Sequence, residues 1–186
     1  MRRNIINFGL FQILWFACIL GAAHSILWPC ILLFLGFAIW QLSPSNRHPG
    51  DFRLMLICLA TGLIVDSGWV QLGIIQYQAA IPTPEFSPIW ILILWMGMAL
   101  TLNHSLAWLK KRLWLAAVFA AVASPLSYYA GSSLGAALVL QDWFTASLVF
   151  GLSWAVIVPL LLYFADNWSI VPLAASDGLL VGKSNT

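Results

Sequence analysis

The side chain best placed to do chemistry is the carboxylate of Asp66, because it lies inside a long apolar segment. Asp66 belongs to the run Thr61–Gly68 of a predicted helix over residues 54–75, roughly 18 Å from its start. A carboxylate near the centre of a bilayer core costs at least a few kcal/mol unless it is paired, hydrogen-bonded, hydrated or protonated. Asp66 is therefore a candidate proton-binding, ligand-binding or catalytic residue. The alternative is a polar contact that joins helices.

Asn103, His104 and Ser105 form a second polar cluster, in the run Thr101–Ser105 of another apolar segment. A histidine can donate or accept a proton near neutral pH, or ligate a metal. About 9 Å of helix would separate His104 from the basic turn at residues 110–112. We therefore expect it to lie shallower than Asp66 and out of direct contact with it. The cluster is a candidate binding or catalytic site, and helix packing is the alternative.

A third polar feature surrounds Pro125, which frees a backbone carbonyl within an apolar segment. Such a break is tolerated where neighbouring side chains or water satisfy the freed group. Ser124 and Ser127 are predicted near the depth of Asp66 and are candidate ligand-binding residues. Tyr128 is a candidate to assist catalysis by Asp66.

Patterns of metal or cofactor chemistry are missing from the sequence. It has no histidine cluster, P-loop, GxSxG or HExxH motif, so we expect no cofactor and no metal. The cysteines Cys18, Cys30 and Cys58 form no CxxC pair and are predicted to pack as small apolar residues. A disulfide between Cys18 and Cys30 stays open, since a hairpin around His24 could bring them together.

The composition of the chain indicates the class of protein in which these residues are held. The chain has 186 residues, of which 62% are hydrophobic and 8% charged, whereas soluble domains are roughly 25% charged. This balance excludes an ordinary soluble enzyme, a disordered chain and a nucleic-acid-binding protein. It indicates an integral membrane protein.

Apolar runs of spanning length predict an all-α bundle of six transmembrane helices in one domain. The apolar stretch over residues 5–41 is too long for one span, and we divide it at the small and polar residues 21–25. Residues 131–142 are left open as a loop, a re-entrant segment or a helix extension. The predicted spans are residues 5–22, 26–42, 54–75, 88–109, 113–130 and 143–164, and residues 165–186 form a tail.

The distribution of charge predicts the orientation of this bundle. With six spans, all eight Lys and Arg residues fall on one side, which the positive-inside rule assigns to the cytoplasm. Both termini are then cytoplasmic, and the first apolar run is kept as a span and not cleaved as a signal peptide. Seven of the 11 tryptophans lie near predicted helix ends, as expected for interfacial anchors, whereas Trp95 and Trp154 are predicted to lie deeper.

Several short motifs resemble a family of small bacterial inner-membrane proteins that is catalogued as a domain of unknown function. They are Gly62–Asp66, Pro88–Trp95, Thr101–Leu106 with Trp108, and Pro125–Tyr128 with Gly131 and Leu134–Ala136. The resemblance covers nearly the whole chain. It implies a multi-pass protein of the bacterial inner membrane without assigned catalytic residues. Genes of this family often lie beside genes for fatty-acyl modification, which suggests a role in that process by analogy only.

Three functions remain open from the sequence. The first is an accessory factor in membrane lipid or fatty-acyl modification, with membrane lipids, other inner-membrane proteins or a second copy as partners. The second is a membrane-embedded enzyme on a lipid or isoprenoid substrate, with Asp66 as acid or base and His104 and Tyr128 assisting. The third is a small proton-coupled transporter with Asp66 as the proton site.

Overall fold

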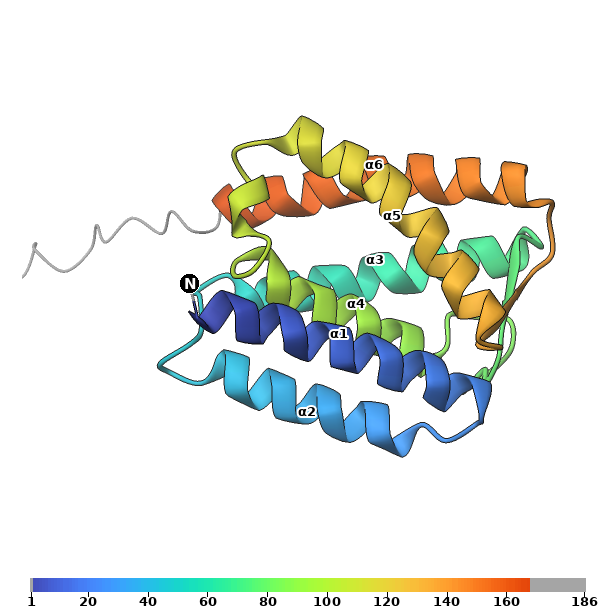
Figure 1. Ribbon diagram of the computed structural model, residues 1–186, viewed down its shortest axis with the longest axis horizontal. Helices are drawn as coiled ribbons and strands as arrows, with labels where there is room; N and C mark the ends of the chain where they lie inside the picture. The colour runs from blue at the N-terminus through green and yellow to red at the C-terminus, as the bar shows by residue number, and fades with distance from the viewer. Residues whose placement is uncertain (1, 168–186) are drawn as a thin grey trace, which may run out of the picture.

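The computed structural model describes residues 2–167 and is built from six α-helices (Figure 1). Their number agrees with the prediction, and the class is all-helical apart from one short ribbon of two strands. The helices are α1 (Arg2–Ala23), α2 (Trp28–Leu42), α3 (Asp51–Gln71), α4 (Ile89–Leu102), α5 (Leu113–Ser133) and α6 (Trp143–Asn167). Most of the predicted tail, residues 168–186, lies outside the described residues.

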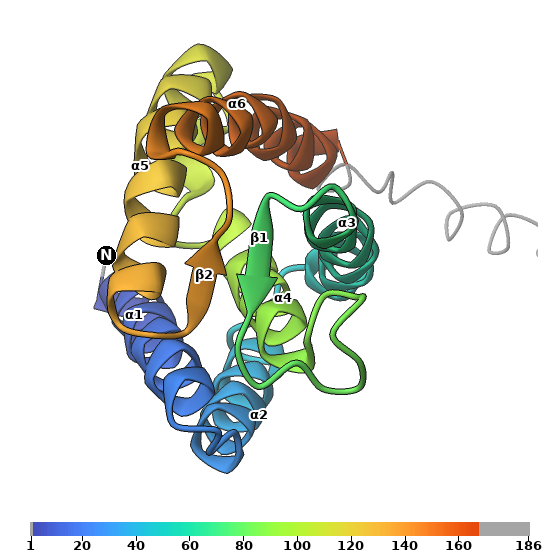
Figure 2. The ribbon, with the colours of Figure 1, turned by 90° about the vertical axis from the view of Figure 1, so that its right-hand side faces the viewer.

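Four of the helices, α1, α3, α5 and α6, are long and apolar enough to cross a membrane. Their length and composition are those of a membrane protein. Helices α2 and α4 are shorter, with 15 and 14 residues. Helix α4 lies at the centre of the bundle when viewed along the helices (Figure 2), and 9 of its residues are buried. Neighbouring helices therefore cover most of its surface.

Two predicted spans end earlier than expected. Helix α3 stops at Gln71, and α4 stops at Leu102, so His104 and Ser105 lie just beyond α4 and not within it. Asn103 caps α4, and its side chain donates a hydrogen bond to Asp51. The chain then makes a turn and a 3-10 helix over Ala107–Leu109. Polar residues that bond to other segments thus end the helix.

Residues 131–142 form neither a simple loop nor a re-entrant segment. Helix α5 continues to Ser133, and Gly135 then makes a tight turn with a φ of 87°, which glycine adopts without strain. Strand β2 (Ala137–Val139) follows and pairs antiparallel with β1 (Ile75–Tyr77). The all-helical prediction missed this ribbon, because three-residue strands are too short to give a periodic pattern.

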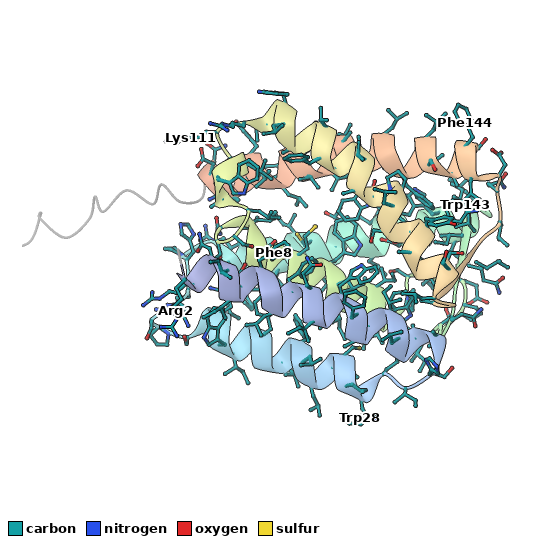
Figure 3. The ribbon with its side chains drawn as sticks, viewed as in Figure 1. Arg2, Phe8, Trp28, Lys111, Trp143 and Phe144 are labelled. Carbon is teal, nitrogen blue, oxygen red and sulfur yellow. The ribbon has the colours of Figure 1, made fainter. Side chains whose placement is uncertain are left out.

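The bundle has two chemically different ends, which Figure 3 shows through Arg2 and Lys111 on one side and Trp143 and Phe144 on the other. The basic end carries the start of α1 and the connections over residues 43–50 and 103–112. The ribbon end carries β1 and β2. Among the described residues all three cysteines are free and buried, so the disulfide left open from the sequence is not formed.

Candidate functional site

Asp66 lies at the centre of a buried cluster of hydrogen-bond donors. Its carboxylate is fully buried and accepts hydrogen bonds from the Tyr77 hydroxyl, from the Trp95 indole N–H at 2.7 Å and from the Tyr128 hydroxyl at 3.2 Å. We call these four residues the Asp66 cluster. They come from α3, β1, α4 and α5, so one carboxylate joins four segments. Hydrogen bonds to a charged acceptor are stronger than neutral ones and offset part of the cost of its burial.

Aromatic rings fix the donors of the Asp66 cluster in place. The Trp95 indole stacks on Trp154 of α6, with ring centroids 4.6 Å apart. The Tyr128 ring stacks on Phe150 of α6 at 4.2 Å. Offset stacked pairs add about 0.5–1.5 kcal/mol each beyond the burial of their area. Helix α6 thus supports the cluster without contributing a hydrogen bond to Asp66.

An apolar pocket of about 370 Å³ lies in front of the Asp66 cluster. Tyr77, Trp95 and Tyr128 form part of its wall, whereas Asp66 lies behind them. The remaining wall comes chiefly from apolar side chains of α1, α4, α5 and α6. Its volume lies within the range of about 300–1,000 Å³ that small-molecule sites occupy.

The pocket fills a wedge between α1 and α5. The two helices lie close together at the ribbon end, where the Trp15 N–H donates to the Ser127 hydroxyl at 3.2 Å, and they diverge toward the basic end (Figure 1). Trp108 and Phe119 line the wide part of the wedge and are 51% and 50% exposed. Since these lining residues reach the surface, the pocket opens at the side of the bundle near the basic end.

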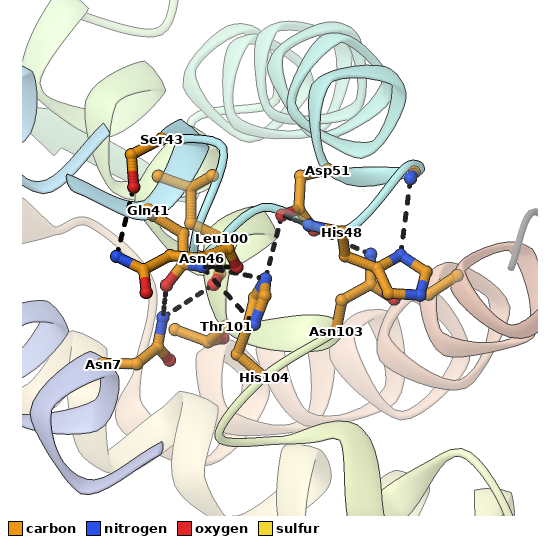
Figure 4. Close-up of polar contacts among 12 residues, drawn as sticks. Asn7, Gln41, Ser43, Asn46, His48, Asp51, Leu100, Thr101, Asn103 and His104 are labelled. Atoms are coloured by element: carbon orange, nitrogen blue, oxygen red, sulfur yellow. Dashed lines mark hydrogen bonds and ion pairs between the residues drawn. The ribbon is translucent and has the colours of Figure 1, made fainter. Parts of the chain in front are cut away.

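A separate polar network occupies the basic end (Figure 4). Its centre is Asp51, the first residue of α3, which is fully buried and lies 2.9 Å from Nε2 of His104. The Asn103 amide and the backbone N–H of His48 also donate to the Asp51 carboxylate. A carboxylate in the first turn of a helix is further stabilised by the helix dipole.

Two buried amides extend this network across α1 and α2. The Asn7 side-chain amide donates to the side-chain carbonyl of Gln41 at 2.7 Å and to the backbone carbonyl of Leu100 at 2.9 Å. It accepts a hydrogen bond from the Ser105 hydroxyl at 2.6 Å. The Gln41 amide nitrogen lies 3.1 Å from the His104 ring. The network therefore ties the ends of four helices to one another.

Lys110 completes the network from the connection that follows α4. Its ammonium donates to the Asn103 side-chain carbonyl at 2.6 Å and to the Ala165 backbone carbonyl at 3.2 Å. Burial lowers the pKa of Lys110 below its ordinary value, and the negative charges of Asp166 and Asp51 oppose that shift. Lys110 thus links the end of α4 to the end of α6.

The predicted site residues therefore divide between two places. Asp66 and Tyr128 meet in the buried cluster, and Ser124 and Ser127 line the pocket beside it. His104, Asn103 and Ser105 belong to the basic-end network, and no hydrogen bond joins them to Asp66 among the described residues. Across those residues no group of three or more His, Cys, Asp or Glu side chains could hold a metal ion.

Five residues of the Asp66 cluster and the basic-end network were not predicted as site residues from the sequence: Asn7, Gln41, Asp51, Tyr77 and Trp95. Asn7 and Gln41 carried a signal, because each is an amide within an apolar helix and must find a partner when buried. Asp51 and Tyr77 lay in segments predicted as loops and gave no such signal. Trp95 was recognised as deep, but the partner of its N–H could not be chosen from spacing.

The fold is a helical bundle in which four helices are long and apolar enough to cross a membrane. The chain belongs to the family described as protein of unknown function (DUF2878), which matches residues 4–160. This agrees with the family resemblance noted from the sequence. No curated protein and no solved structure is significantly similar to the chain.

Proposed function

We propose that the protein spans a bacterial inner membrane six times, with both termini in the cytoplasm. The supporting observation is the segregation of charge between the two ends of the bundle. The connections at the basic end contain Arg47, Lys110, Lys111 and Arg112, whereas those over residues 24–27, 72–88 and 134–142 contain no Lys or Arg. That asymmetry follows the positive-inside rule. Helix α4 would then cross the membrane largely within protein, where short or interrupted helices are tolerated. Helix α2 would cross at the edge of the bundle, with apolar side chains such as Leu32 and Ile39 exposed to lipid.

Single cysteines introduced at the two ends test this topology. The native cysteines are buried, so labelling with a membrane-impermeant maleimide would report the new positions. We expect Glu85→Cys to be labelled in intact spheroplasts and Ser45→Cys only after permeabilisation. The reverse pattern would contradict the orientation, and labelling of both in intact spheroplasts would contradict the number of spans.

We further propose that the protein holds an acyl chain of a membrane lipid and serves as an accessory factor in lipid or fatty-acyl modification. The observation that carries this proposal is the pocket, which is apolar, of ligand-binding size and open at the side of the bundle. An acyl chain could enter from the bilayer without crossing water. Binding sites for small molecules are typically lined by apolar side chains with a few polar groups.

A pocket-filling substitution tests the proposal. Ala120→Phe would place a ring in the pocket, and the matched control Val118→Phe would place one on the exposed face of the same helix. We expect mass spectrometry of the purified proteins to show less co-purified lipid with Ala120→Phe only. In a deletion strain, Val118→Phe should restore the wild-type lipid profile and Ala120→Phe should not. Equal lipid binding by both variants would refute the proposal.

A second candidate, a membrane-embedded enzyme that uses Asp66, has one observation in its favour. Tyr77, Trp95 and Tyr128 line the pocket and also bond to Asp66, so a bound molecule would lie one side chain away from the carboxylate. Against it, the same three donors occupy the carboxylate. Asp66→Asn separates the candidates: enzymatic use predicts a deletion-like lipid profile, whereas a binding role predicts a profile close to wild type.

A further inference from the structure

The pocket contains a buried hydroxyl that has no partner. Ser124 of α5 is 7% exposed, its Oγ makes no hydrogen bond, and it lines the pocket. A buried hydroxyl without a partner is costly, and such groups are rare in folded proteins. The free hydroxyl therefore points to a polar atom on the molecule that fills the pocket.

A second polar atom in the same wall is only weakly engaged. The indole nitrogen of Trp154 on α6 is buried beside the Tyr128 hydroxyl, which can accept from it, although no hydrogen bond of full geometry is formed. By contrast, the Trp90 N–H donates to the Gln78 carbonyl at 2.9 Å and the Ser127 hydroxyl accepts from Trp15. The donors of the Asp66 cluster are occupied as well. The Ser124 hydroxyl is thus the buried group of this wall that is left for a ligand, and the Trp154 N–H is a second donor in the same wall.

The chemistry of these two groups restricts the ligand atom. A serine hydroxyl donates and accepts, whereas an indole N–H only donates, so the group that suits both is an acceptor oxygen. Among the described residues that line the pocket none carries a charge. An ionised ligand group would lose its hydration there without compensation. The ligand oxygen is therefore uncharged, as in a hydroxyl, keto or ester group.

The depth of Ser124 places this oxygen along the chain and not at a headgroup. Ser124 lies roughly 16 Å along α5 from Leu113 at the basic end, as helix rise gives it. That is about half of a bilayer core of roughly 30 Å. A lipid with its headgroup at the basic end would present the middle or distal part of its acyl chain at this level.

From these observations we infer that the pocket binds an acyl chain that carries one uncharged oxygen substituent part-way along its length, held by the Ser124 hydroxyl. This inference rests on the proposed acyl-chain binding and adds the chemical class of the ligand. A plain chain would leave the Ser124 hydroxyl unsatisfied, so the site should distinguish the two kinds of chain.

Competition binding to the delipidated full-length protein in detergent tests the inference. The probes are octadecanoic acid, 12-hydroxyoctadecanoic acid and 12-ketooctadecanoic acid, each displacing tritiated 12-ketooctadecanoic acid. We expect the two oxygenated chains to bind about three- to tenfold more tightly than octadecanoic acid, the effect of one buried hydrogen bond. Ser124→Ala should abolish that preference. Ser153→Ala is the matched control, because Ser153 lies on α6 outside this pocket.

The outcomes separate this inference from the proposed function. If the wild-type protein binds all three acids equally, or if Ser124→Ala keeps the preference, the inference is wrong and acyl-chain binding stands. If no acid binds, or if Ala120→Phe leaves binding unchanged, the proposed function itself fails. Thermal melting of each variant shows whether a lost preference reflects misfolding.

Discussion

Gly62 and Gly68 lie on the same helix, α3, but only Gly62 packs directly against a side chain, that of Trp95. Substituting each by alanine therefore compares a crowded position with an open one. A Cβ added at Gly62 would lie 2.3 Å from Cδ1 and 2.5 Å from Cγ of Trp95. These atoms belong to a rigid indole that is stacked on Trp154 and bonded to Asp66. A Cβ added at Gly68 would meet nothing within 4 Å. We therefore expect Gly62→Ala to displace Trp95 and Gly68→Ala to be accepted.

The loss of unfolding free energy expected for Gly62→Ala has two parts. Overpacking a rigid neighbour costs about 1–3 kcal/mol, and removing a donor from the buried Asp66 carboxylate costs about 1–3 kcal/mol more. Gly62→Ala should then lose about 2–6 kcal/mol of unfolding free energy. At roughly 2–4 °C per kcal/mol for a domain of this size, its Tm should fall by at least about 4 °C. Gly68→Ala should gain about 0.5–1 kcal/mol from helix propensity.

Thermal unfolding of the purified variants in one detergent is the measurement. Tryptophan fluorescence provides an additional signal, because only Gly62→Ala should alter the environment of Trp95. If Gly62→Ala melts within 1 °C of the wild-type protein, or if both variants shift equally, Trp95 does not occupy the position described.

Three further substitutions test the packing and the polar clusters. Trp95→Phe removes one donor from Asp66 and should lower the unfolding free energy by about 1–3 kcal/mol; an unchanged Tm would mean that this bond is not formed. Asn7→Ala breaks four hydrogen bonds of the basic-end network and should destabilise the protein by about 2–4 kcal/mol. Asn4→Ala, on the exposed face of the same helix, should not, and equal melting of the two variants would contradict the network. Gly151→Ala would place a Cβ 2.9 Å from the Ala121 carbonyl oxygen and should separate α5 from α6 at a cost of about 1–3 kcal/mol, detectable as weaker protection of α5 and α6 from hydrogen exchange.

The sequence was sufficient to predict the helices, because apolar runs of about 20 residues are typical of membrane-spanning helices and of few other structures. It was also sufficient to identify Asp66 as buried, since one carboxylate in an apolar helix stands out. Its partners were not predictable: Tyr77 reaches it from a ribbon formed by two segments about sixty residues apart. Such long-range pairing depends on how the helices pack, which short motifs do not encode.

The basic-end network shows a different limit. The sequence predicts His104 inside the helix over residues 88–109. In the structure α4 ends at Leu102, and the His104 side chain lies beside Asp51. The sequence predicts a loop at Asp51, between the spans over residues 26–42 and 54–75, because its position beside Gly50 and Arg53 is typical of a polar connection. An acidic residue that begins a helix looks the same in sequence whether it is solvated or fully buried. Only the positions of the neighbouring helix ends distinguish the two cases.

The ribbon of β1 and β2 also determines the shape of the space inside the bundle. Tyr77 and Ala137, one from each strand, form part of the pocket wall at the ribbon end, and both are buried. The ribbon therefore covers part of the pocket at one end, whereas the exposed Trp108 and Phe119 border it near the basic end. A change in the pairing of the two strands would alter the pocket wall and, through Tyr77, the hydrogen bonds of Asp66 together.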